Sequence, residues 1–279
     1  MHTNTWMGIA ICLLGFTRQA WAAPSETNEN LMVLVADPHV FPEKIKRANG
    51  YEADTLEHFT NMVRDVAAMS PRPGAILFLG DLVEQPTAEA YTLFRHLLAP
   101  VYAAKIPCFF ILGNHDQSAR FYEVFPEWKA KTQATGTLAY RIERPAFDVL
   151  TLETTDPKNM GGYYGKIGPE IRDWLQTEIR KTPGQPIFIA AHHDVDFGTF
   201  YPGLAKEPNV QGWLNGHWHQ HVQKKSPEGI RIFWLPSLGF MDGDKNPVTG
   251  YVLLEADAKE YRMTLITNNR TTRIPVISR

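Results

Sequence analysis

Short apolar runs recur along the chain and alternate with segments whose apolar residues have helical spacing. Because each run is only six or seven residues long, we expect each to form a β-strand. Several runs are apolar at nearly every position, which predicts sheets that are covered on both faces. The runs span residues 31–36, 75–80, 106–112, 147–153, 186–191 and 230–235.

Helical spacing predicts helices over residues 56–66, 88–104 and 169–181, with Pro169 suited to a first helical position. Residues 250–256 and 261–267 have the pattern of two antiparallel strands. Strand–helix alternation followed by paired strands predicts an α/β protein with a mixed sheet. Nothing in residues 31–279 reads as a boundary, so we expect one domain there.

The first thirty residues have a different character. An apolar run, residues 6–16, precedes Ala20-Trp21-Ala22, whose small residues fit a cleavage site before Ala23. This pattern predicts a signal peptide over residues 1–22. The alternative is an uncleaved anchor, but the run is shorter than the roughly 20 residues that span a bilayer. We therefore expect a secreted protein without a stable membrane span.

The cysteines and the net charge indicate the compartment and the class of partner. Cys12 would be lost with the signal peptide, so Cys108 could form no intrachain disulfide, as is common in a bacterial periplasm. The formal net charge is −2, which disfavours a nucleic-acid surface because such surfaces carry a basic excess. A single small phosphate ester remains a compatible partner. The sequence leaves the oligomeric state open.

Five apolar strands end in polar residues that are good metal ligands. Parallel strands bring their carboxyl ends to one edge of a sheet, so these side chains should converge. Carboxylates, imidazoles and an amide oxygen suit Mn, Fe or Zn, and seven such ligands fit two ions about 3.5–4 Å apart. The candidate ligands are Asp37, His39, Asp81, Asn114, His192, His217 and His219.

These residues fall into blocks whose order and spacing resemble the calcineurin-like metallophosphoesterase family. The blocks are Asp37-x-His39, Gly80-Asp81, Gly113-Asn114-His115-Asp116, His192-His193 and Gly216-His217-Trp218-His219. The resemblance is greatest to the small single-domain branch of cyclic-nucleotide and glycerophosphodiester phosphodiesterases. It implies a four-layer αββα sandwich with two mixed β-sheets, and the metal site at the rim between the sheets.

The resemblance also implies roles for the residues. One transition-metal ion would be held by Asp37, His39 and His219, a second by Asn114, His192 and His217, and Asp81 would bridge them. A metal-bound hydroxide would attack phosphorus in line. His115 would protonate the leaving oxygen or stabilise its charge, and Asp116 would orient His115 or a ligand.

Two positions depart from the family pattern. Glu84 stands where Asp or Asn is usual, and Asp194-Val195-Asp196 replaces Pro-Pro after His192-His193. Two added carboxylates would repel a highly charged phosphate, which favours a diester; alternatively they orient a substrate hydroxyl or recruit a cation. His193 competes with His192 as the ligand, and otherwise faces substrate together with Asp194. Tyr164 is a further candidate for substrate contact.

The sequence therefore predicts a secreted metal-dependent phosphoesterase that prefers a phosphodiester. A phosphomonoesterase or a nucleotide pyrophosphatase could use the same two ions. A non-catalytic metal-binding partner module is the rival from another class. The presence of His115 beside all the ligands argues against that rival, because a protein without activity would tolerate its loss.

Overall fold

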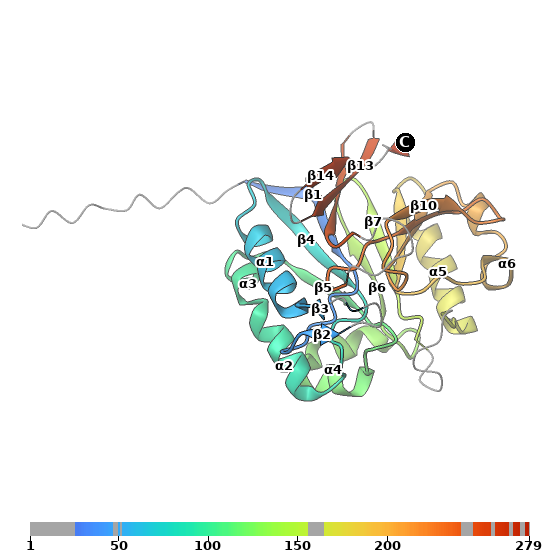
Figure 1. Cartoon of the computed structure of the whole chain (residues 1–279). Coiled ribbons are helices and arrows are strands. Elements are labelled where there is room, and N and C mark those ends of the chain that lie inside the picture. Colours follow the sequence, from blue (N-terminus) through green and yellow to red (C-terminus); the bar gives the residue numbers. More distant parts are fainter. Residues whose placement is uncertain are drawn as a thin grey trace, which may run out of the picture.

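The structure is a computed structural model that describes residues 26–46, 50, 52–155, 165–240, 248–257, 260–267, 270–273 and 277–278. The predicted signal peptide over residues 1–22 and Tyr164 lie outside these residues. Two β-sheets lie face to face, and helices cover the outer side of each (Figure 1). This arrangement confirms the predicted αββα sandwich.

The first sheet runs in the order β14-β13-β12-β1-β4-β5, with β15 paired to β13. Strands β1, β4 and β5 are parallel, whereas β12 and β13 run antiparallel to their neighbours. The predicted C-terminal strand pair is confirmed as β12 and β13. The strands are β1 (Thr27–Val35), β4 (Arg72–Leu79), β5 (Cys108–Ile111), β12 (Tyr251–Ala256), β13 (Glu260–Thr267), β14 (Arg270–Arg273) and β15 (Ile277–Ser278).

The second sheet runs in the order β10-β11-β9-β8-β7-β6. Its inner strands are parallel, and β6 and β10 pair antiparallel at the edges, so both sheets are mixed. The strands are β6 (Ala139–Glu143), β7 (Asp148–Leu152), β8 (Ile187–Ala191), β9 (Val210–Asn215), β10 (Val222–Lys225) and β11 (Arg231–Trp234). A short hairpin, β2 (Ile45–Lys46) with β3 (Glu52–Ala53), lies apart from both sheets.

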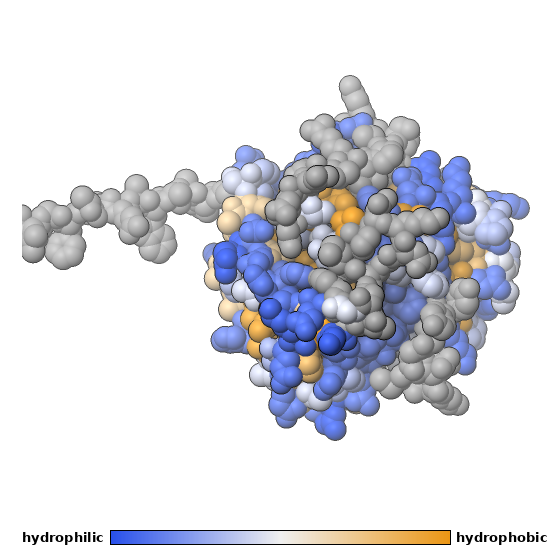
Figure 2. Space-filling view, in the orientation of Figure 1, coloured by the Kyte–Doolittle hydropathy of each residue, from blue (hydrophilic) through white to orange (hydrophobic). Residues whose placement is uncertain are grey.

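Alternation along β8 explains how one strand serves two hydrophobic layers. Phe188 and Ala190 face the first sheet, whereas Ile187 and Ile189 pack under the helices of the second sheet. Such strands are apolar at every position, as the sequence predicted. The face in Figure 2 is mainly hydrophilic over the described residues, with scattered apolar patches.

Four helices accompany the first sheet and two accompany the second (Figure 1). The helix predicted over 88–104 is divided at Leu98, because Pro100 has no N–H to continue the helical hydrogen bonds. The helices are α1 (Thr55–Ala67), α2 (Ala88–Leu97), α3 (Ala99–Ala103), α4 (Ser118–Val124), α5 (Pro169–Lys181) and α6 (Phe197–Phe200), with 3₁₀ turns η1 (Pro126–Thr132) and η2 (Leu204–Lys206).

A largely buried ionic cluster joins α5 to the second sheet. Arg141 of β6 donates to Asp148, and its Nε lies 3.0 Å from Oε2 of Glu178 on α5. The side chain of Arg141 is only 11% exposed, so removing it would leave the buried Asp148 without its cation, whereas Glu178 would keep its ion pair with Lys181. Within the part of the chain that the structure describes, no helix is long and apolar enough to cross a membrane.

Candidate metal centre

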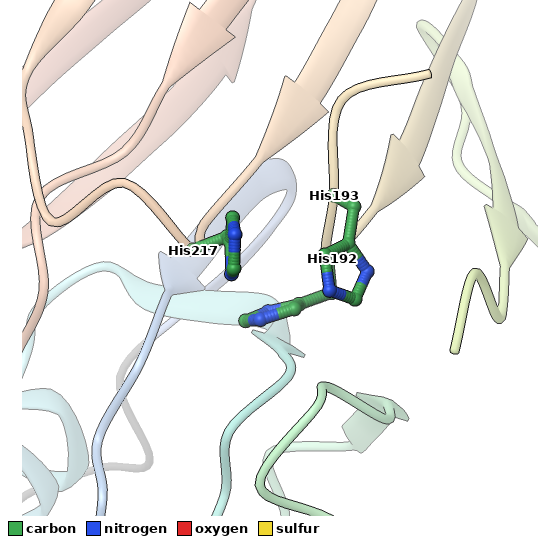
Figure 3. Close-up of side chains that lie close together, drawn as sticks. All are labelled: His192, His193 and His217. Carbon is green, nitrogen blue, oxygen red and sulfur yellow. The ribbon is translucent and has the colours of Figure 1, made fainter. Parts of the chain in front are cut away.

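The candidate ligands come from the carboxyl ends of parallel strands in both sheets. Asp37 follows β1, Asp81 follows β4 and Asn114 follows β5, while His192 and His217 follow β8 and β9. Figure 3 shows His192, His193 and His217 close together at the ends of β8 and β9. The seven candidate ligands predicted from sequence thus lie at one rim.

The backbone at this rim adopts unusual conformations. Five candidate ligands have positive φ angles between 44° and 69°, a region that non-glycine residues seldom occupy. Such conformations cost about 1–3 kcal/mol each and cluster at functional sites. The five are Asp37, His39, Asp81, His217 and His219.

Three glycines let these loops approach one another. A Cβ at Gly80 would lie 2.3 Å from Nδ1 of His192, and one at Gly113 would lie 2.2 Å from Oδ1 of Asp81. A Cβ at Gly216 would lie 2.4 Å from Oδ2 of Asp37. Of the three, only Gly80 also has a positive φ, so close approach rather than turn geometry requires the other two.

The first group of donor atoms belongs to Asp37, His39 and His219. Nε2 of His39 lies 3.3 Å from Nε2 of His219, and Nε2 of His219 lies 3.7 Å from Oδ1 of Asp37. Asp81 adjoins this group, because its Oδ2 is 3.5 Å from Nε2 of His39.

The second group belongs to Asn114, His192 and His217. Oδ1 of Asn114 lies 3.0 Å from Nε2 of His192 and 2.9 Å from Nδ1 of His217. Oδ2 of Asp81 is 3.3 Å from Nε2 of His192, so the same carboxylate oxygen adjoins both groups. Two ligands of one ion lie about 3.0–3.4 Å apart when metal–ligand bonds are about 2.1 Å. The donor atoms therefore fit two ions that share Asp81.

Hydrogen bonds behind the donors fix which ring nitrogen faces the centre. Nδ1 of His192 lies 2.9 Å from the carbonyl oxygen of Leu79, which can only accept. Nδ1 of His39 lies 2.8 Å from Oε2 of Glu84. Both rings therefore turn Nε2 toward the centre, and the contact with Leu79 requires a proton on Nδ1 of His192, an arrangement typical of metal-bound histidines.

Electrostatics make this centre receptive to cations. Burial raises the pKa of Asp37. Burial would also raise the pKa of Asp81, but His192 and His39 outweigh it and hold that pKa well below its usual value. Burial would lower the pKa of His192, but Asp81 and Asp37 raise it to about 9. The buried carboxylates thus depend on neighbouring positive charge, which divalent ions can supply.

The contacts of Asp116, in the block Gly113-Asn114-His115-Asp116, bear on the two roles expected for this residue. Its carboxylate accepts hydrogen bonds from the backbone N–H groups of Leu82 and Gly113 and from the Tyr91 hydroxyl. It therefore ties together the loops after β4 and β5, which carry Asp81 and Asn114. Of the two expected roles, orienting His115 or orienting a ligand, these contacts favour the second. Glu84 does contact the side chain of His115, because Nδ1 of His115 lies 3.2 Å from the carbonyl oxygen of Glu84.

The acidic loop after His193 also has partners within the protein. Oδ2 of Asp194 accepts hydrogen bonds from Nε1 of Trp234 at 2.9 Å and Nζ of Lys224 at 3.2 Å. Asp196 caps α6 through the backbone and hydroxyl of Thr199. Both carboxylates thus have partners within the protein, and Lys224 offsets the charge of Asp194.

His193 is buried beside the second group and stays a candidate for it. Its donor atom lies within 4.8 Å of those of His192 and His217. Burial, together with His192 and His217, lowers its pKa to about 2, so it carries no charge. Its Nδ1 lies 2.9 Å from Oγ1 of Thr154, whereas Nε2 of His192 lies 3.0 Å from Oδ1 of Asn114 and 3.3 Å from Oδ2 of Asp81. The geometry thus favours His192 as the ligand.

Sequence reasoning missed several side chains that support the centre. Thr154 lies two residues after the end of β7, as several ligands lie after their strands, so its position was a usable signal. Lys224 and Trp234 gave no signal, because they reach Asp194 only through the pairing of β10 with β11.

Comparisons with known proteins agree with this geometry. A sequence model described as calcineurin-like phosphoesterase matches residues 32–221. The 3',5'-cyclic adenosine monophosphate phosphodiesterase CpdA of Pseudomonas aeruginosa is 26% identical over 228 residues, which cover 77% of this chain and 78% of that protein. A probable glycerophosphodiester phosphodiesterase GpdQ of Arcobacter nitrofigilis is 26% identical over 164 residues, or 58% of this chain and 56% of that protein.

The aligned part thus spans only about half of the GpdQ relative. Among solved structures, a dimetal phosphatase from Danio rerio superposes with a TM-score of 0.68 at 12% identity and covers 88% of this chain and 98% of that one. At this identity the likeness shows a shared fold.

Proposed function

The chain belongs to the calcineurin-like phosphoesterase family, and from this premise we propose that it hydrolyses a small phosphodiester at a centre of two transition-metal ions. Membership makes it a metal-dependent phosphoesterase. The observation that carries the two-ion proposal is the position of Asp81, whose Oδ2 adjoins His39 on one side and His192 on the other.

In this proposal each group of donors holds one ion. Asp37, His39 and His219 hold the first, Asn114, His192 and His217 hold the second, and Asp81 bridges them. When bound, the ions lower the pKa of a coordinated water and clamp the phosphoryl oxygens. Mn, Fe and Zn all suit these ligands.

His115 is the group that handles the proton of the leaving oxygen. Its side chain is 39% exposed, so it can reach substrate, and its Nδ1 contacts the carbonyl of Glu84. That contact requires a proton on Nδ1 and leaves Nε2 to donate to the leaving oxygen when the ring is protonated. The diester preference rests on the relatives named as phosphodiesterases, now that the acidic loop is engaged internally.

Turnover of chromogenic esters tests the proposal. The Mn²⁺-loaded protein should hydrolyse bis-p-nitrophenyl phosphate faster than p-nitrophenyl phosphate, and the ion-free protein should hydrolyse neither. Asn114→Ala should lower kcat/KM by more than about 100-fold, since even residues behind a ligand cost 10- to 100-fold. Gln223→Ala, which truncates an exposed amide on β10, is the control. Full activity of Asn114→Ala would refute the assignment of Asn114 as a ligand. Faster hydrolysis of the monoester would refute the proposed preference for a diester.

We also propose that the protein is exported to a bacterial periplasm after removal of residues 1–22. The apolar run followed by Ala20-Trp21-Ala22 supports this. The intact mass of protein recovered from the periplasm of an expressing cell should correspond to a chain that begins at Ala23. A chain that keeps Met1 and stays in the cytoplasm would contradict the proposal.

A further inference from the structure

Two stacked tryptophans stand behind the second group of donors. Trp218 lies between His217 and His219, and its ring stacks on Trp234 with centroids 5.1 Å apart and planes 26° apart. The same ring meets the imidazole of His217 edge-on, at 5.1 Å and 71°. The imidazole of His217 therefore rests against an aromatic pair rather than against flexible side chains.

The outer tryptophan is fixed by a charged pair. Trp234 donates from Nε1 to Oδ2 of Asp194, and Nζ of Lys224 lies 3.2 Å from the same oxygen. Nζ of Lys224 also lies 3.4 Å from the centroid of the Trp234 ring. Asp194 is only 8% exposed, whereas the side chain of Lys224 is 36% exposed, so these contacts join a buried carboxylate to a partly exposed cation.

Asp194 also belongs to the loop that carries His192. Its carbonyl accepts from the N–H of Gly165 at 3.0 Å, which holds the backbone of this loop from a second side. The loop is held again one residue earlier, where Nε1 of Trp213 lies 3.3 Å from the carbonyl of His193. The side chain of Asp194 thus connects the His192 loop to the tryptophans behind His217.

We propose that Asp194, Trp218, Trp234 and Lys224 form a brace that positions His192 and His217 for the second ion. All four are positioning residues, because they act on the ion only through the two histidines. The inference rests on the two-ion centre proposed above and adds what sets the affinity of its second half.

The brace should not act on the first ion. The rings of His39 and His219 both pack on Phe240, with centroids 4.7 and 5.6 Å away, and His39 is held by Glu84. Loosening the brace should therefore weaken one ion and leave the other in place. Residues behind metal ligands typically change affinity by about 10- to 100-fold.

Titration of the ion-free protein with Mn²⁺ tests the brace, by calorimetry and by the electron paramagnetic resonance signal of a coupled pair of ions. Asp194→Ala and Lys224→Met should weaken the second ion, by about 10- to 100-fold for Asp194→Ala, and convert the coupled signal to that of a single ion. Trp234→Phe removes the Nε1 donor and part of the ring that stacks on Trp218, and should act in the same direction. Asp194→Asn, which keeps an acceptor for Trp234, should recover part of the loss. Lys225→Met, at the neighbouring exposed position on β10, should bind both ions normally.

The outcomes separate this inference from the proposed function. Two normally bound ions in Asp194→Ala and Trp234→Phe would overturn the brace, as would equal weakening of both ions. If Asp194→Ala does not fold, the Mn²⁺ titrations of Trp234→Phe and Lys224→Met test the brace in its place. An unaltered protein that binds one ion would overturn the brace together with the two-ion centre. Two bound ions and a selective loss in the variants, without turnover of any ester, would support the brace and refute the phosphodiesterase function.

Discussion

Gly80→Ala probes how tightly the loops around the candidate centre are packed. Gly80 has φ of +85°, and an added Cβ would lie 2.3 Å from Nδ1 and 2.8 Å from Cβ of His192. A contact with the ring tip could be relieved by rotation, but a contact with Cβ requires the whole side chain of His192 to move. That movement would break its hydrogen bond to the carbonyl of Leu79.

Gly136 supplies a control with the same backbone strain. Its φ is +76°, but an added Cβ would meet nothing within 4 Å. The left-handed conformation costs alanine about 1–2 kcal/mol at both positions. At Gly80 overpacking adds about 1–3 kcal/mol, and the lost hydrogen bond adds about 1 kcal/mol. Gly80→Ala should therefore be destabilised by roughly 2–4 kcal/mol more than Gly136→Ala.

Urea unfolding of the ion-free variants measures this difference, and Mn²⁺ titration measures the effect on the centre. Gly80→Ala should bind the ion at His192 more weakly, whereas Gly136→Ala should bind both ions as the unaltered protein does. If the two variants differed by less than about 1 kcal/mol and both bound two ions normally, the close approach of Gly80 to His192 would not constrain the site.

Three further outcomes follow from buried groups. Burial and the charge of Asp81 raise the pKa of Asp116 to about 7, so the folded state holds the proton of this carboxyl more tightly than the unfolded state does. The free energy of unfolding of the ion-free protein should therefore fall as the pH rises from about 4 to 7. Urea unfolding should show a smaller fall in Asp116→Asn. Arg141→Ala should lose about 3–5 kcal/mol in chemical denaturation, because it leaves the buried carboxylate of Asp148 without its cation, while Lys181 still pairs with Glu178. Arg120→Ala, at an exposed ion pair, should lose less than about 1 kcal/mol, and similar losses in the two variants would refute the buried cluster. Burial raises the pKa of Cys108 to about 12, so a thiol reagent should modify this residue only after denaturation. In the denatured protein, one reactive thiol would indicate that Cys12 has been removed, and two would indicate that Cys12 is retained.

Features that follow from the pattern of strands along the chain could be predicted from the sequence. The convergence of Asp37, Asp81, Asn114, His192 and His217 was predictable. Each directly follows an apolar strand, and parallel strands end at one edge. The division of the second helix was also readable in principle, because a proline within a helical pattern removes a backbone donor.

Only the tertiary structure decided which groups support these ligands. Asp116, in the loop after β5, binds Tyr91 of α2, and Asp194 binds Lys224 and Trp234 from strands 30 and 40 residues away. A carboxylate can accept from any donor that packing brings near it, and local sequence says nothing about which donor arrives. The pattern of the chain therefore determined the ligands and their common rim. The pairing of β10 with β11 and the packing of the loops decided how firmly each ligand is held.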